Sequence, residues 1–240
     1  MKNSAAEKGF TMMELMIVVA LMPMLFFALY STFTMANVVL QTDDVYSRVN
    51  QSAIQIVRNI NREVGQTSPN LLPLHLSITV DGNNNNVMRF QVPVDSDGDG
   101  DVTNGAANPA VEWGATDQAP GVVQTSLGQT QLTLAPRLGA WIQYTVVVTV
   151  VNANLTTRQL VRDVLDSALV LVPGTRQIIA SNVAPTTGAN VPGFRAARVL
   201  NTLTTTLTLR ATDTIGQGGA ARTLGDTTFT SSTILRNAVN

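Results

Sequence analysis

The chain of 240 residues has no cysteine, one histidine, and charged residues at only 13% of its positions. The absence of cysteine excludes disulfides, thiol nucleophiles and thiolate metal sites. A single histidine, His75, cannot form a multi-histidine zinc centre within one chain. The formal net charge of −1 gives no basic footprint for nucleic acid, so we expect no nucleic-acid partner. Because 45% of the residues are hydrophobic, a disordered chain is also excluded.

The hydrophobic residues are concentrated near the N-terminus. From Leu15 through Thr42 the chain has 28 consecutive residues without a charge, and about 20 apolar residues are enough to cross a bilayer as a helix. No small-residue cleavage site follows at the distance that a secretory signal requires, so we expect this segment to stay with the mature protein. Residues 10–40 are therefore predicted to form a transmembrane or filament-core helix. Residues 1–9 form a polar leader that holds both lysines of the chain, Lys2 and Lys8.

The junction between leader and apolar segment, residues 8–15, reads KGFTMMEL. It resembles the processing site of type IV prepilins and type II secretion pseudopilins. That site has a basic leader, a glycine before the cut, an N-methylated phenylalanine after it, and a glutamate five residues into the mature chain. The resemblance implies that prepilin peptidase cleaves between Gly9 and Phe10. The mature chain would then begin at a methylated Phe10 and contain no lysine.

Glu14 lies directly before this apolar segment and is the first charged residue on the mature side of the junction. A charge near the centre of a membrane helix costs roughly 2.5–3.5 kcal/mol on insertion scales, and such groups usually have a partner. The helix dipole favours a carboxylate in the first turn. Two offset helices can pair Glu14 of one with the Phe10 amine of the next, which is the assembly rule that the resemblance implies. The alternative is a carboxylate that lies in the headgroup layer without further role.

Helical periodicity continues through residues 41–66, which we predict to be an amphipathic continuation of the same helix. The apolar stripe consists of Val49, Ala53, Ile56, Val57, Ile60 and Val64. Arg62 and Glu63 are expected on the solvated side, and Gly65 with Pro69 supplies a stop signal. Pro23 removes one helical hydrogen bond and should kink the helix locally. It is either a flexible point or a proline that a membrane helix tolerates.

Residues 67–240 are predicted to form a β-rich globular head, because threonine, valine and leucine alternate through most of them. The expected strands cover residues 74–80, 87–92, 131–135, 140–151, 155–165, 176–183, 197–211 and 227–236. The predicted fold class is α+β: a long N-terminal helix, membrane-spanning in its first half, packed on an antiparallel β-sheet head, as in pilins.

The head adds a second resemblance. The hairpin WIQYTVVVTVVNANLTTRQLVRDV (141–164) and the ending TFTSSTILRN (228–237) are similar to W-type minor pilins of type IV pili and J-type minor pseudopilins of type II secretion. This implies a large minor subunit of a pilus or pseudopilus. The size of the head favours a place at the tip or in the initiation complex, because heads this large pack poorly in a uniform shaft. Its partners would be prepilin peptidase, other major and minor subunits, and an inner-membrane assembly platform. The precursor would be a single-pass protein of the bacterial inner membrane, with its head outside the cytoplasm.

An aspartate-rich loop is the one candidate metal site. Asp95, Asp97, Asp99 and Asp101 alternate with small residues, as in the first half of a calcium loop, and Gly100 permits the sharp turn. The twelfth position of such a loop is alanine here instead of a bidentate glutamate. Calcium is the cofactor that this pattern favours. The alternative is an exposed acidic loop that binds no ion.

Nothing in the sequence favours catalysis. His75 lies in an apolar strand pattern and is expected to be structural, as are Trp113 and Trp141. There is no nucleophile-elbow sequence and no phosphate-binding glycine loop. We therefore predict a structural subunit and not an enzyme. Two other classes stay open: a membrane-anchored, calcium-binding adhesin or binding module that does not polymerise, and, less favoured, an anchored hydrolase.

Overall fold

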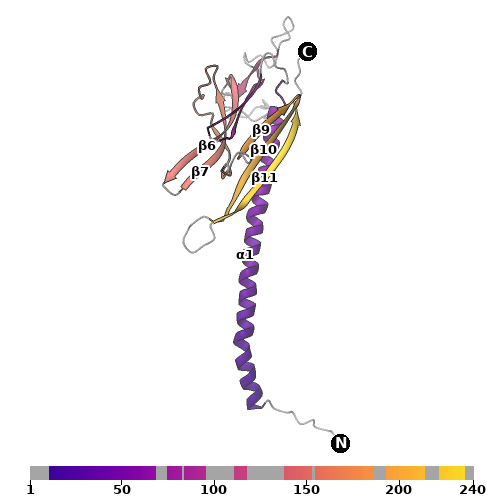
Figure 1. Cartoon of the computed structure of the whole chain (residues 1–240), viewed down its shortest axis with the longest axis vertical. Coiled ribbons are helices and arrows are strands. Elements are labelled where there is room, and N and C mark those ends of the chain that lie inside the picture. The colour runs from indigo at the N-terminus through magenta and orange to yellow at the C-terminus, as the bar shows by residue number, and fades with distance from the viewer. Residues whose placement is uncertain are drawn as a thin grey trace, which may run out of the picture. The chain divides into compact units, whose positions relative to one another are not determined.

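The computed structural model describes residues 11–68, 75–82, 84–95, 111–117, 138–152, 155–185, 193–213 and 222–235. The chain divides into two compact units, Met1–Tyr46 and Ser47–Asn240, and the helix α1 (Met12–Val64) contributes to both (Figure 1). The strands described in the second unit form antiparallel sheets. The predicted α+β class is confirmed.

Local hydrogen bonds mark both ends of the helix α1. Thr11 and Glu14 form a capping box at its start, since each accepts a hydrogen bond from the other's backbone amide. At its end, the Gly65 amide donates to the Asn61 carbonyl over 2.8 Å. A Cβ at Gly65 would lie 2.9 Å from that same oxygen, so glycine suits the close approach. The helix ends at Val64, directly before the predicted stop signal at Gly65, and it continues through Pro23 without interruption.

The largest sheet has five antiparallel strands in the order β1-β2-β6-β7-β8. These strands are β1 (Leu76–Val80), β2 (Asn86–Phe90), β6 (Trp141–Asn152), β7 (Leu155–Leu165) and β8 (Gln177–Ala180). The pair β6–β7 is a long hairpin, which Figure 1 shows projecting from the head. Its strand bounds lie within one residue of those predicted from the alternation of the sequence.

Two further sheets have three strands each, in the orders β11-β10-β9 and β3-β4-β5. The first contains β9 (Phe194–Val199), β10 (Thr202–Asp213) and β11 (Arg222–Ile234). The second contains β3 (Val92–Pro93), β4 (Trp113–Thr116) and β5 (Leu138–Gly139). On one face of the β10–β11 pair, threonine and serine hydroxyls pair across the strands at 3.0–3.1 Å, as in Thr204 with Ser232 and Thr206 with Thr230.

One predicted strand is wrong. Residues 197–211 form the end of β9, a two-residue turn and most of β10, with Val199 paired to Thr202. The turn contains Leu200 at a φ of 53°, a conformation that glycine or asparagine normally supplies. The sequence has no glycine there, so the usual hairpin signal was missing. The predicted strand at 131–135 lies outside the described residues.

The core of the head lies between the end of α1 and the sheets. The helix buries the stripe residues Ala53, Ile56, Val57, Ile60 and Val64. They pack in one cluster with side chains such as Met88, Phe90, Ile142, Leu160, Phe194 and Leu207, all fully buried. Burying aliphatic and aromatic side chains of this size stabilises the head by roughly 1.5–3 kcal/mol each. This stripe is the one predicted from the helical periodicity.

Candidate functional site

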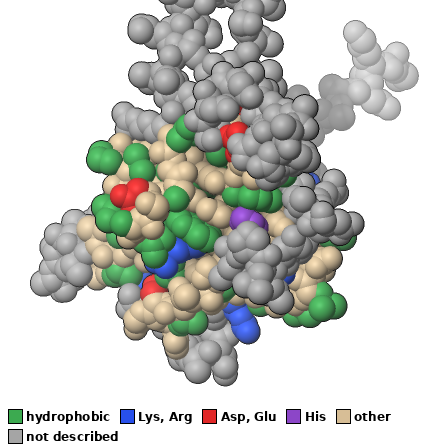
Figure 2. All heavy atoms as spheres, turned by 90° about the horizontal axis from the view of Figure 1, so that it is seen from above, with side chains coloured by type: hydrophobic (Ala, Val, Ile, Leu, Met, Phe, Trp, Pro, Cys, Tyr) green, Lys and Arg blue, Asp and Glu red, His purple; other side chains and the backbone are tan. Residues whose placement is uncertain are grey.

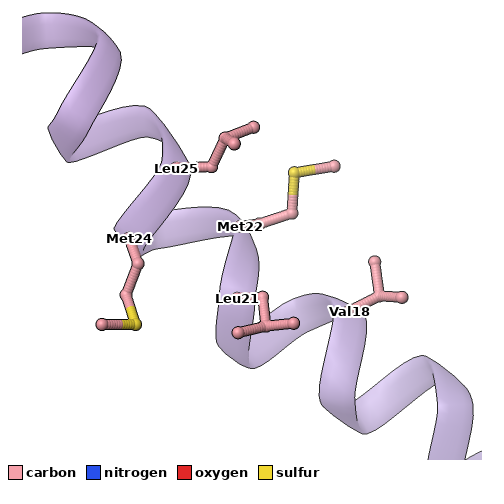
Figure 3. A pocket seen from close by; sticks show the side chains of 5 residues that line it. All are labelled: Val18, Leu21, Met22, Met24 and Leu25. Atoms are coloured by element: carbon pink, nitrogen blue, oxygen red, sulfur yellow. The ribbon is translucent and has the colours of Figure 1, made fainter.

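The first half of α1 carries its apolar side chains on the outside. Between Met12 and Leu40 every large apolar residue that the structure describes is exposed by 46% or more. Figure 3 shows five of them, Val18, Leu21, Met22, Met24 and Leu25, which project outward around the helix. We call these exposed side chains of Met12–Leu40 the apolar helix surface. A helix that is apolar all round is buried in lipid or among other helices in its working state.

Length and composition make α1 able to cross a membrane, and it is the one such helix among the described residues. Its location near the N-terminus is consistent with a membrane anchor or a signal sequence. Apart from Glu14, the part that would lie in the hydrocarbon layer is uncharged. The apolar helix surface therefore has the extent that a single membrane span requires.

Glu14 is held by the residue that starts the helix. The Thr11 amide donates to Glu14 Oε2 over 2.8 Å, and the Thr11 hydroxyl donates to the same oxygen over 3.0 Å. The Glu14 amide in turn donates to the Thr11 hydroxyl oxygen over 3.3 Å. Both of these hydrogen bonds to the carboxylate end on Oε2, and Oε1 accepts none from the described residues. This role of Thr11 was not predicted, although the pattern Thr-x-x-Glu before an apolar run is its signature.

Two of the predicted processing residues, Gly9 and Phe10, lie outside the described residues. Cleavage between them therefore stays a prediction, as does the pairing of Glu14 with a Phe10 amine.

The calcium site also stays a prediction. Asp95 is half-buried at the end of the described segment 84–95, and Asp97, Asp99 and Asp101 lie outside the described residues. Among the residues with described positions, no group of three or more acidic or histidine side chains is placed to hold a metal ion. A melting curve of the full chain with and without millimolar calcium tests the prediction, and an unchanged curve would remove it.

A buried charged cluster lies where the last turn of α1 meets the sheets, and it contradicts the predicted position of Glu63. Glu63, predicted on the solvated side, is only 2% exposed. Its carboxylate accepts two hydrogen bonds from Arg162 Nε, at 3.0 and 3.1 Å, and one from Arg162 Nη2 at 2.5 Å. The Tyr144 hydroxyl donates to Glu63 Oε2 over 2.5 Å. The reason is geometric: Glu63 follows Ile56 by seven residues, which places both on the same side of a helix.

Arg162 extends this cluster to a third element. It stands on β7 between Leu160 and Val164, whose side chains face the core, and its Nη2 also donates to the Thr116 carbonyl of β4 over 2.6 Å. Its Nη1 is buried and has no hydrogen-bond partner among the described residues. The next residue, Asp163, points to the other face, where Arg176 donates to both carboxylate oxygens over 2.8 Å. Consecutive opposite charges in a strand were a signal that one of them faces inward.

The electrostatics of the cluster follow from burial and the Glu63 charge. Burial, followed by the negative charge of Glu63, raises the pKa of the Tyr144 hydroxyl well above its usual value. Burial alone would lower the pKa of the Arg162 guanidinium, but the hydrogen bonds and charge of Glu63 outweigh it and raise that pKa. Both groups therefore keep their protons around Glu63 at neutral pH.

The same helical turn is bonded to the three-stranded sheet β11-β10-β9. Asn61 Nδ2 donates to the Ser231 hydroxyl over 2.7 Å, and the Thr233 hydroxyl donates to the Asn61 carbonyl over 3.4 Å. Two residues apart on the helix, Glu63 and Asn61 thus bond to different sheets. We call Glu63, Arg162, Tyr144, Asn61 and Ser231 the helix clamp.

The single histidine lies in a packed environment. His75 is 6% exposed, its ring stacks on Trp113 with centroids 4.2 Å apart, and its Nδ1 lies 2.7 Å from Gln91 Oε1. Gln91 Nε2 donates to the Ala140 carbonyl, which identifies Oε1 as the acceptor and Nδ1 as the donor. This geometry matches the structural role predicted for His75 and Trp113.

Charged groups are sparse on the head. On the face drawn in Figure 2, the few blue and red side chains are scattered among polar and hydrophobic ones. Arg210 and Asp226 form a half-exposed ion pair across β10 and β11, with Nε 2.9 Å from Oδ1.

Comparison of the chain with protein-family models, with curated proteins and with solved structures finds no match. The fold nevertheless has a known kind of architecture. A long apolar N-terminal helix, whose last turns pack on antiparallel β-sheets, is a pilin-like architecture.

Proposed function

We propose that this chain is a minor pilin or pseudopilin, a structural subunit of a type IV pilus or a type II secretion pseudopilus. The observation that carries the proposal is the apolar helix surface, which the chain itself leaves exposed. Lipid covers such a surface in the precursor, and the helices of neighbouring subunits cover it after assembly. The chain acts as a building element and not as an enzyme.

The precursor inserts in the bacterial inner membrane as a single-pass protein, with its head outside the cytoplasm. Prepilin peptidase removes residues 1–9, and an inner-membrane assembly platform moves the mature subunit into the filament beside other pilins or pseudopilins. Support for this route comes from the KGFTMMEL junction and from the helix that begins directly after it.

Glu14 sets the axial offset between neighbouring helices in this proposal. Its Oε2 is held by Thr11, and its Oε1 is directed to the Phe10 ammonium of the next subunit. An ion pair removed from water in this way is strongly directional, because each charge is left unpaired in any other register. The large β head favours a place at the tip or in the initiation complex, since heads of this size pack poorly in a uniform shaft.

Mass spectrometry of the native N-terminus tests the proposal most directly. We expect a chain that begins at N-methylated Phe10. A native chain that still begins at Met1 would contradict the proposal and favour the membrane-anchored binding module instead.

Substitution of Glu14 tests the assembly step separately. We expect Glu14→Leu to reduce incorporation into sheared filaments about tenfold or more, because coupling energies of close charge pairs exceed the roughly 1.4 kcal/mol that a tenfold change requires. Met16→Leu, an apolar exchange in the same turn region, is the matched control and should incorporate normally. Equal incorporation of Glu14→Leu and the control would rule out the pairing role.

A further inference from the structure

We propose that the helix clamp selects one axial register of α1 on the head, a register that the apolar stripe alone does not specify. The inference concerns the fold of the single subunit. Only its consequence for assembly rests on the proposed function: a fixed register places the head at a fixed position along the helix that enters the filament.

The apolar stripe is degenerate under a shift of one helical turn. If each residue moved into the place of the residue four positions later, four of the five stripe sites would again receive an apolar side chain. Val49 would take the site of Ala53, Ile56 that of Ile60, and Ile60 that of Val64. Such a shift moves the helix by about 6 Å, at 1.5 Å per residue. Hydrophobic burial therefore distinguishes the two registers weakly.

The helix clamp is not degenerate. In the shifted register Asn59 would replace Glu63 opposite Arg162, and Val57 would replace Asn61 opposite Ser231. The buried guanidinium, whose Nη1 already has no partner among the described residues, would then lose the carboxylate that pairs with it. An unpaired buried charge is strongly destabilising, and a buried polar group that fixes register is the best-attested use of such pairs.

The clamp also joins the elements of the head to each other. Glu63 bonds to Tyr144 on β6 and Arg162 on β7, Arg162 bonds to β4, and Asn61 bonds to β11. All three sheets are thus tied, directly or through Arg162, to one turn of α1. A change of helix register would have to break the hydrogen bonds of α1 to β6, β7 and β11 at once, so the clamp resists force applied along the helix axis.

The test is a distance measurement in the full chain in detergent micelles. Because the chain has no cysteine, Gln55→Cys on α1 can be spin-labelled together with Thr79→Cys or Arg195→Cys, all of which replace exposed side chains. In the wild-type background each pair should give one distance. The double variant Glu63→Met/Arg162→Met keeps volume and removes both charges, so its melting temperature should stay near the wild-type value. We expect a second distance population in at least one label pair, displaced by up to about 6 Å.

The matched control removes an ion pair that does not contact α1. Arg210→Met/Asp226→Met breaks the half-exposed pair between β10 and β11 and should leave a single distance. A single wild-type distance in the Glu63→Met/Arg162→Met chain would overturn the proposal. Because the measurement uses the monomer in micelles, that result would leave the proposed filament function untouched.

A second measurement decides the matter if the methionine pair does not fold. Tyr144→Phe removes one clamp hydrogen bond and keeps the ring packed on Phe90. We expect faster hydrogen exchange of the amides of residues 57–64 and unchanged exchange in β10. Equal exchange of the 57–64 amides in Tyr144→Phe and wild type would also overturn the proposal.

Discussion

The same residue types lie in opposite environments in the two units of the chain. Met22 and Leu25 are 46% and 59% exposed on α1, whereas Met88 and Leu160 are fully buried in the head. The apolar side chains of the head are buried by other residues of the same chain, including those at the end of α1. The apolar side chains of the first half of the helix are not buried within the chain. They leave water only when lipid or other helices cover them.

The largest effect is expected when the two units are separated. We expect the full chain to stay with the membrane fraction during alkaline carbonate extraction. A chain that begins at Ser47 should be released, because it lacks the apolar helix surface and retains every buried core residue. Release of the full chain by carbonate would contradict the membrane role of the helix.

One leucine substitution in each unit measures how much a buried and an exposed leucine contribute to the stability of the head. Leu160→Ala should lower the free energy of unfolding of the head by about 2–5 kcal/mol, since a fully buried leucine leaves a cavity. Leu25→Ala should leave the unfolding of the head unchanged, because that side chain is exposed on α1. Chemical denaturation in micelles, followed by tryptophan fluorescence, measures both. Equal effects of the two variants would mean that the helix surface is covered within the subunit.

The clamp gives the head a dependence on alkaline pH. The folded-state pKa of Tyr144 lies above the unfolded value of about 10, so its stabilisation is complete below pH 10 and is lost as the pH rises further. Tyr144→Phe should cost about 1.5–3 kcal/mol at neutral pH, the range for hydrogen bonds to charged groups. It should also reduce the fall in stability above pH 10. Melting temperatures of both proteins from pH 7 to 11 provide the check, and parallel curves would refute the assignment.

The smallest expected effect concerns the start of the helix. Thr11→Ala removes both the hydroxyl that caps Glu14 and the acceptor for the Glu14 amide. Loss of such a cap costs about 0.5–2 kcal/mol, confined to the first turn. Hydrogen exchange of the amides of residues 12–15 should become faster, while Thr11→Ser, which keeps the hydroxyl, should exchange as wild type does. Unchanged exchange in Thr11→Ala would show that the capping box contributes little.

Much of the fold was predictable because the patterns are long. The helical stripe from Ala53 to Val64 and the hairpin β6–β7 each repeat their period over several turns or strand residues, and the structure confirms both. The turn at Leu200–Asn201 was not predictable, since leucine rarely adopts a positive φ and no glycine marks the hairpin. The position of Glu63 was predicted wrongly because its charge indicated exposure to solvent, although its spacing from Ile56 on the helix indicated burial in the core.

The amino-acid sequence alone determined that a long apolar helix precedes a β-rich head, because hydrophobicity and period are local properties of the chain. The sequence also places Glu14 in the first turn of that helix. The burial of Glu63 against Tyr144 and Arg162 depends on the tertiary structure, since these two residues lie 81 and 99 positions after Glu63 in the chain. A contact between residues so far apart in the chain depends on how the strands pack on the helix, and a local sequence pattern does not predict it.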